Sequence, residues 1–199
     1  MKNGLRIAVA DDERDMRDYF QRILPLAGHH VISVAETGRQ LVEQCRTAKP
    51  DLVITDIKMP DMDGIEAAET INREHEVPFI LVSAYHGPEL IERANADCIL
   101  AYLVKPIKQA DVEPAIGLAM RRFEQFKSLR KEAGDLRQAL NDRKIIERAK
   151  GIMMRRLGLN EQDVFHRLQK LASHRNRKLV DIAQTVLTAE ETFQALEKV

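Results

Sequence analysis

The sequence predicts an α/β fold: a five-stranded parallel, doubly wound sheet, followed by a region built of helices alone. The first observation is alternation, because short apolar runs alternate with amphipathic segments over residues 5–104, as in strand–helix–strand units. The second is that polar side chains follow these runs, at the strand ends where open α/β sheets bind ligands. The third is that apolar residues beyond residue 107 recur every three or four positions, the spacing of helices.

Each predicted strand is a run of four to six mostly apolar residues, of the kind that is buried on both faces of a sheet. The segments between the runs place apolar residues on one helical face, as Met16, Phe20 and Ile23 do in the first of them. We expect strands at residues 5–10, 31–35, 52–55, 77–82 and 99–104, and helices at residues 13–26, 38–46, 64–73 and 89–94.

Charged and hydroxyl side chains stand at the carboxyl ends of four of the predicted strands. An Asp in such a place is, taken alone, usually a helix cap or a turn residue. Parallel strands bring their carboxyl ends to one edge of the sheet, however, so these side chains can converge in one crevice. They are Asp11, Asp12, Asp56, Ser83 and Lys105.

These residue types suit the transfer of a phosphoryl group onto the protein itself. Clustered carboxylates repel one another unless a hard divalent cation joins them, and Mg²⁺ keeps open coordination positions for phosphate. An Asp carboxylate can accept a phosphoryl group, and a metal ion with a Lys neutralises the charge that develops during transfer. Since no other chemistry is evident, we expect a protein that is phosphorylated and is not itself an enzyme.

At these residues the chain resembles the receiver domain of bacterial two-component response regulators, over roughly residues 4–122. The resemblance implies a flavodoxin-like fold and a sensor histidine kinase that phosphorylates Asp56. It also implies a Mg²⁺ ion bound by Asp11, Asp12, Asp56 and the backbone carbonyl of Lys58.

The same resemblance assigns the residues that respond to the phosphoryl group. It implies Ser83 as the switch hydroxyl, and Lys105, before a cis Pro106, as the cation that contacts the phosphate. Tyr102 matches the aromatic switch position, although its place also suits a partly exposed strand aromatic.

A long helix is expected to leave this domain. Apolar residues recur after residue 111 in steps of 4 and 3, with one extra step of 3 between Phe126 and Leu129, which is heptad spacing with a stammer. The stripe is longer than the last helix of a receiver needs, so we favour a coiled coil with a second chain or another helix over packing on its own domain. The stripe comprises Val112, Ile116, Ala119, Phe123, Phe126, Leu129, Ala133, Leu136 and Leu140.

The net charge of zero hides an asymmetry between the two ends of the chain. Residues 1–110 hold 13 Lys and Arg against 18 Asp and Glu, whereas residues 144–188 hold 10 against 4. This predicts a cation as ligand of the first region and a polyanion as ligand of the second. We expect a receiver domain at 1–122, a connector at 123–140 and a bundle of three short helices at 141–199, with Asn160 as an N-cap and Gly158 as a C-terminal cap.

Gly151 lies in the middle of a predicted helix, where it costs about 1 kcal/mol relative to Ala. It indicates the close approach of another backbone, of protein or nucleic acid, or simple helix packing.

Residues 130–190 resemble the ANTAR domain of RNA-binding transcription antitermination regulators. The match rests on residues 136–154, above all Ala149-Lys150-Gly151-Ile152-Met153, and on Val164-Phe165 and residues 178–183. Val164 departs from the Ala that is usual in the family. The resemblance implies binding to leader RNA with paired stem-loops, whose unstacked loop bases are accessible. The RNA contacts that we expect are Lys150, Gly151, Met154, Arg155, Arg175 and Lys178.

Together these patterns predict a phosphorylation-controlled antiterminator that forms a homodimer when phosphorylated. The alternatives are a DNA-binding response regulator with a helix-turn-helix, and a receiver whose helical output binds proteins. No run of about 18 apolar residues predicts a membrane span, and no secretory signal is expected at the start. Cys45 and Cys98 have no spacing pattern and fit a reducing cytoplasm, which is the expected location.

Overall fold

The structure is a computed structural model that describes residues 4–84 and 98–196. The chain divides into two compact units, Met1–Ser128 and Leu129–Val199, which are described separately. No helix in the described ranges is both long enough and apolar enough to cross a membrane.

The first unit contains one sheet of five parallel strands in the order β2-β1-β3-β4-β5. This order, with β1 and β3 in the interior, is that of a flavodoxin-like fold and confirms the predicted fold class. The strands are β1 (Arg6–Ala10), β2 (His30–Ala35), β3 (Leu52–Asp56), β4 (Phe79–Ser83) and β5 (Ile99–Val104).

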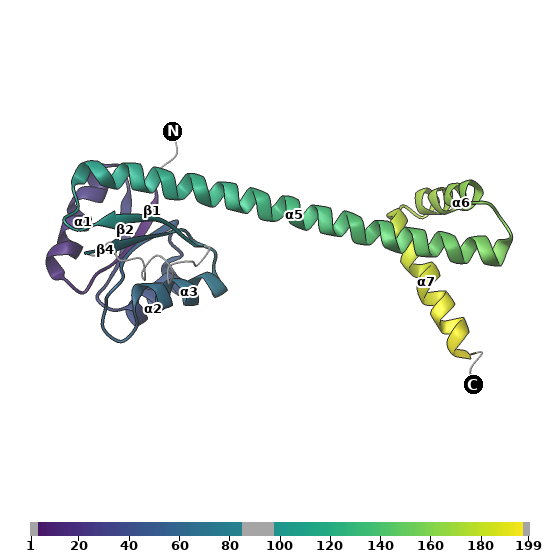
Figure 1. Ribbon diagram of the computed structural model, residues 1–199, viewed down its shortest axis with the longest axis horizontal. Coiled ribbons are helices and arrows are strands. Elements are labelled where there is room, and N and C mark those ends of the chain that lie inside the picture. The colour runs from purple at the N-terminus through teal and green to yellow at the C-terminus, as the bar shows by residue number, and fades with distance from the viewer. Residues whose placement is uncertain (1–3, 85–97, 197–199) are drawn as a thin grey trace. The chain divides into compact units, whose positions relative to one another are not determined.

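Helices cover both faces of this sheet (Figure 1). One core is formed with α2 (Gly38–Ala48) and α3 (Gly64–Glu74), and the other with α1 (Arg14–Leu26) and the start of α5 (Gln109–Leu157). All five residues of β3 are buried, because alternate side chains of this strand enter the two cores. The predicted helix at 89–94 lies outside the described residues.

The local chemistry of the chain explains where α2 and α3 begin. Thr37 Oγ1 accepts a hydrogen bond from the backbone N–H of Gln40, and Asp63 Oδ1 accepts from Ile65 and Glu66, which are N-cap contacts. Gly64 follows Asp63 because the chain passes close to the end of β3 there. A Cβ at Gly64 would lie 2.0 Å from the carbonyl oxygen of Asp56.

The second unit consists of the last part of α5, α6 (Glu161–His174) and α7 (Leu179–Leu196). The prediction of three short helices needs a correction, because residues 144–157 are the end of the 49-residue α5 and not a separate helix. No residue between Gln109 and Leu157 has a positive φ; the first after them is the predicted cap Gly158, at +64°. The last helix, α7, runs to Leu196.

A small core joins the three helices of the second unit. Helix α6 buries only Val164, Leu168 and Ala172, spaced four residues apart along one stripe. This stripe packs with Ile182 of α7 and with partly buried residues that include Met153 and Met154 of α5. A second cluster, Ala149 with Ala183 and Leu187, continues the contact between α5 and α7.

Candidate functional site

Asp56 is the last residue of the central strand β3, and its side chain is almost fully buried. One carboxylate oxygen, Oδ1, accepts a hydrogen bond of 2.8 Å from the backbone N–H of Ile57. The other, Oδ2, lies 3.1 Å from Nζ of Lys105. The predicted phosphoacceptor is thus held in a fixed orientation at the carboxyl edge of the sheet.

Carboxylates from the end of β1 lie beside Asp56. Asp11, Asp12, Glu13 and Asp56 each offer one oxygen, and these four atoms lie within 4.8 Å of one another. Asp11 is completely buried, and its Oδ1 accepts the backbone N–H of Glu13 at 2.9 Å. Glu13 was not among the predicted site residues, although its place directly after Asp11 and Asp12 was a signal that could have identified it.

Lys105, which follows β5, is the cation of this cluster. Its Nζ lies 3.1 Å from Asp11 Oδ2 and 2.8 Å from Glu13 Oε1, in addition to its contact with Asp56. The Lys105–Pro106 peptide bond is cis, as predicted, and the backbone N–H of Lys105 donates to the carbonyl of Ser83. Three predicted residues, Asp11, Asp56 and Lys105, are therefore in direct contact.

The carboxylates of this cluster are short of positive charge. Burial raises the pKa of both Asp11 and Asp56 above the usual range, despite their contacts with Lys105. Burial acts to lower the pKa of Lys105, but hydrogen bonds to Glu13 and Asp11 outweigh it, so this pKa is also raised. One ammonium group serves several carboxylates, which leaves a clear electrostatic role for a further cation.

The donor set fits Mg²⁺, which prefers carboxylate and carbonyl oxygens. Asp11 Oδ2 is buried and makes no hydrogen bond, since its 3.1 Å approach to Lys105 is an ion pair without hydrogen-bond geometry. A buried carboxylate oxygen without a hydrogen bond is costly, and coordination to a metal ion would satisfy it. Asp12 and Glu13 are more exposed and lie toward solvent, so the cluster is accessible.

Ser83, Tyr102 and the Lys58 carbonyl were also predicted for this site. Ser83 ends β4 and is buried, next to the central strand in the sheet. Tyr102 lies on the edge strand β5 with 44% of its surface exposed. This exposure suits both an aromatic switch residue and an ordinary aromatic side chain at the edge of a sheet. The assignments of Ser83, Tyr102 and the Lys58 carbonyl stay predictions.

In the second unit, the predicted RNA contacts fall into different environments. The Lys150 side chain is covered, and its Nζ donates to Glu147 at 2.8 Å and to Glu161 at 2.6 Å. These two hydrogen bonds raise the pKa of Lys150, and its Nζ also lies 5.6 Å from the ring centre of Phe165. Met154 packs on the core between α6 and α7.

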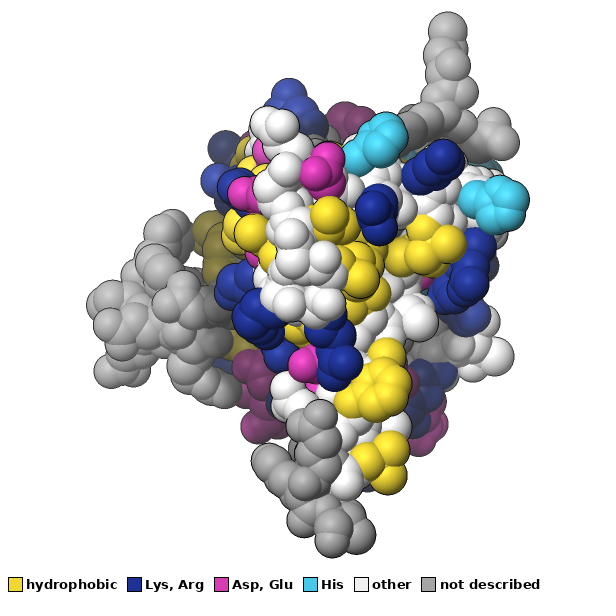
Figure 2. Space-filling view, turned by 90° about the vertical axis from the view of Figure 1, so that its right-hand side faces the viewer, with side chains coloured by type: hydrophobic (Ala, Val, Ile, Leu, Met, Phe, Trp, Pro, Cys, Tyr) yellow, Lys and Arg dark blue, Asp and Glu magenta, His cyan; other side chains and the backbone are white. Residues whose placement is uncertain are grey.

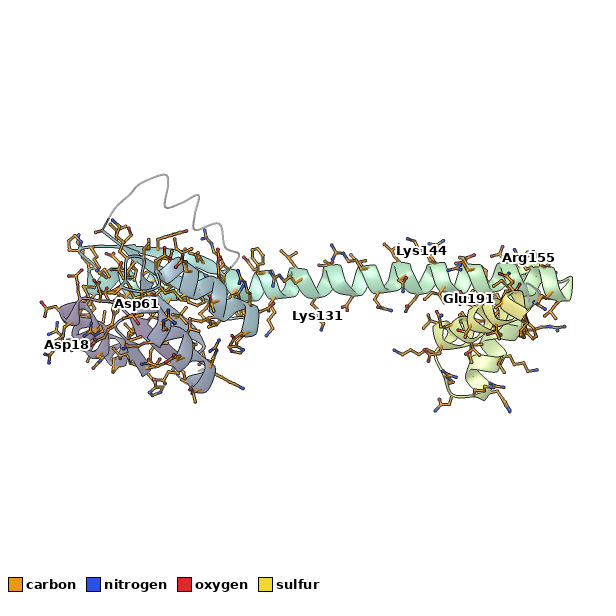
Figure 3. All side chains as sticks on the ribbon, turned by 90° about the horizontal axis from the view of Figure 1, so that it is seen from below. Asp18, Asp61, Lys131, Lys144, Arg155 and Glu191 are labelled. Atoms are coloured by element: carbon orange, nitrogen blue, oxygen red, sulfur yellow. The ribbon has the colours of Figure 1, made fainter. Side chains whose placement is uncertain are left out.

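The remaining predicted contacts are more open. A Cβ at Gly151 would meet only Arg155 Nη1, at 3.8 Å, so this glycine does not serve close packing against another described part of the chain. Arg155, Arg175 and Lys178 are exposed, and Arg155 is labelled in Figure 3. Their contact with RNA stays a prediction.

Comparison with known proteins identifies both units. Residues 7–117 match the response regulator receiver domain, and residues 134–187 match the ANTAR domain. The transcriptional regulatory protein PdtaR of Mycobacterium tuberculosis is 37% identical over 182 residues, which is 92% of this chain and 89% of that protein.

Two solved structures resemble the first unit. The signal receiver domain of NarL from Mycobacterium tuberculosis has a TM-score of 0.54 and 26% identity, over 58% of this chain and 94% of that one. A chain in the CheX–CheY–BeF₃–Mg²⁺ complex of Borrelia burgdorferi has a TM-score of 0.52 and 25% identity, over 56% of this chain and 85% of that one.

Proposed function

Because the chain belongs to the response regulators that join a receiver domain to an ANTAR domain, we propose that phosphorylation of Asp56 controls its binding to leader RNA. The observation that carries this proposal is the convergence of Asp56, Asp11 and Lys105, in which a buried oxygen of Asp11 makes no hydrogen bond. The bound RNA would then be unable to form a terminator hairpin, so that transcription continues.

The transfer reaction begins with a phosphohistidine of a sensor kinase. A carboxylate oxygen of Asp56 attacks the phosphorus atom, the new P–O bond forms, the P–N bond breaks, and the histidine ring leaves with its electron pair. Lys105 moves from the Asp56 carboxylate to an oxygen of the transferred group and neutralises its charge. Asp11, Asp12, Asp56 and the Lys58 carbonyl would hold Mg²⁺, which would supply further neutralisation of the transferred group. The Ser83 hydroxyl donates to another phosphate oxygen.

Helix α5 offers a means to join two copies of the chain. Every residue from 124 to 141 is exposed, and Phe126, Leu129, Leu136 and Leu140 expose between 42% and 63% of their surface. Figure 3 shows side chains of this stretch, Lys131 among them, projecting outward from the helix. A stripe of apolar residues at heptad spacing is buried when a second helix pairs with it.

Dimerisation would link phosphorylation to RNA binding. Two paired α5 helices would bring two ANTAR domains together, and each could bind one of two adjacent stem-loops. The second binding event then takes place at a high effective concentration, so the pair binds more tightly than one domain. The phosphoryl group adds a charge of about −1.5 to −2 and new hydrogen-bond acceptors, which can shift the receiver toward the dimeric state.

The test measures mass and RNA binding in the same samples. The full chain with Mg²⁺ is analysed by sedimentation with and without beryllofluoride, a phosphoryl mimic, and is titrated with a labelled leader RNA that carries two adjacent stem-loops. We expect beryllofluoride to increase both the dimer fraction and the RNA affinity. An unchanged mass and affinity would contradict phosphorylation control, and tighter binding to duplex DNA of the same sequence would contradict the RNA ligand.

A further inference from the structure

The basic residues of the second unit differ in what their side chains contact. Lys150 is held by two glutamates, and Arg156 Nε lies 2.5 Å from Glu190 Oε2 with its guanidinium over the Phe193 ring. All five cations of α6 and of the turn between α6 and α7 are exposed and make no side-chain hydrogen bond or ion pair within the part of the chain that the structure describes. They are Arg167, Lys170, Arg175, Arg177 and Lys178.

Helix α6 carries two of these cations on a side that is turned away from its buried stripe. Arg167 and Lys170, with His174, are spaced three and four residues apart and lie on one face, over a length of about 10 Å along the helix axis. The acidic residues of α6, Glu161 and Asp163, are both in its first turn. Glu161 binds Lys150 and Asp163 binds Asn160, so neither provides a counter-charge for this face.

The other three cations belong to the turn between α6 and α7. Its backbone is fixed by hydrogen bonds from the N–H groups of Arg175, Asn176 and Arg177 to carbonyls in the last turn of α6, at 3.0–3.2 Å. Asn176 has a φ of 50°, a left-handed conformation that Asn tolerates better than most residues. The turn therefore presents Arg175, Arg177 and Lys178 on a backbone that is already ordered.

We propose that Arg167, Lys170, Arg175, Arg177 and Lys178, which we name the α6 basic surface, bind the phosphate backbone of an RNA stem-loop. This rests on the proposed function. It keeps Arg175 and Lys178 from the predicted RNA contacts and adds three cations, Arg167, Lys170 and Arg177. Figure 2, a view from this end of the chain, shows Lys and Arg side chains beside the His side chains at the upper right, and further Lys and Arg side chains near the centre.

The charges and shapes of this surface favour RNA over a protein partner. Cations without carboxylate neighbours can pair with the phosphates of a bound RNA. Their binding releases the counterions that are condensed on the RNA, which favours the complex. Arg guanidinium planes and His rings can also stack on the unpaired bases of a loop. A protein interface would need a larger apolar centre than this face provides, since Leu171 is 38% exposed and has Lys170 directly before it and Arg167 one helical turn earlier.

The experiment compares two variants with the same change in charge. Arg167→Gln/Lys170→Gln removes two cations of the α6 basic surface, and Lys127→Gln/Lys131→Gln removes two exposed cations from α5. Both full-length variants are titrated, with Mg²⁺ and beryllofluoride, against the two-stem-loop RNA at several salt concentrations. Circular dichroism shows whether each variant is folded.

We expect the α6 variant to bind at least tenfold more weakly, with the slope of log K against log salt reduced by about 0.7–0.9 for each phosphate that the variant no longer neutralises. The α5 variant is expected to bind like the wild type. If the wild type binds the RNA and the two variants bind equally well, the assignment of RNA to the α6 basic surface is wrong while the proposed function stands. If the wild type does not bind this RNA, both are wrong.

Discussion

Lys105 and Lys150 are both largely covered lysines held by carboxylates, yet their surroundings differ in kind. The partners of Lys105 come from the ends of β1 and β3, and they include a buried oxygen that makes no hydrogen bond. The partners of Lys150 are Glu147, one turn earlier on α5, and Glu161 at the start of α6. The first arrangement leaves a charge imbalance that a ligand can use, whereas the second is complete and ties two helices together.

The difference shows how topology creates a site. Parallel strands bring residues that are distant in sequence to one sheet edge, where no local pairing can neutralise them. A helix instead offers partners three or four residues away, and a lysine on it is readily neutralised by its own neighbours. Ionisable side chains with shifted pKa values at converging strand ends are thus better candidates for chemistry than a covered lysine on a helix.

The largest effect, on phosphorylation, is expected from Asp56→Asn, which replaces the nucleophilic carboxylate by an amide of the same shape. Phosphorylation by a small phosphodonor should be lost completely, because an amide does not form the acyl phosphate. Asp61→Asn is the matched control, since Asp61 has a φ of 66° that Asn also tolerates. The phosphoprotein is measured on a gel that retards phosphorylated chains, and a phosphorylated band in the Asp56 variant would contradict the assignment.

Lys105→Gln should slow phosphoryl transfer by about 100-fold to 1,000-fold, the usual cost of removing a group that stabilises developing charge. The variant keeps Asp56 and the acidic cluster, so it retains the nucleophile and loses only the cation. Lys108→Gln, an exposed lysine on the same segment, provides the control for a change of net charge. Equal phosphorylation rates in the two variants would show that Lys105 balances charge in the resting state alone.

Replacing the exposed leucines of α5 should separate phosphorylation from dimerisation. Leu129→Gln/Leu136→Gln is expected to weaken the beryllofluoride-dependent dimer about 100-fold or more, because burying a leucine side chain contributes about 1.5–3 kcal/mol. Phosphorylation of Asp56 should be unchanged. Sedimentation over a range of concentrations measures the dissociation constant, with Lys127→Gln/Lys131→Gln as the control on the other side of the helix. A dimer as stable as that of the wild type would place the contact elsewhere.

The sequence predicted the first unit more completely than the second, and the reason is physical. The five strands and the convergence of Asp11, Asp56 and Lys105 follow from a topology that the alternating runs specify. The cis bond at Pro106 was implied by the resemblance to receiver domains. The environment of Lys150 depends on how α5 packs on α6, which helical periodicity alone does not determine. For the same reason Met154, predicted at the RNA interface, lies against the core, and the break between connector and bundle is absent.

The smallest effect on RNA binding is expected from Lys150→Gln, although Lys150 belongs to the most specific part of the ANTAR match. Its ammonium is already neutralised by Glu147 and Glu161 and adds little to phosphate binding, so its removal should change the RNA affinity by no more than about twofold. The variant should instead unfold at a lower temperature, because it leaves two glutamates without their cation. Its melting curve and RNA titration, set beside those of Arg167→Gln/Lys170→Gln, distinguish a lysine that holds the bundle together from cations that contact RNA. A large loss of affinity with an unchanged melting temperature would mean that RNA displaces the two glutamates and binds Lys150 directly.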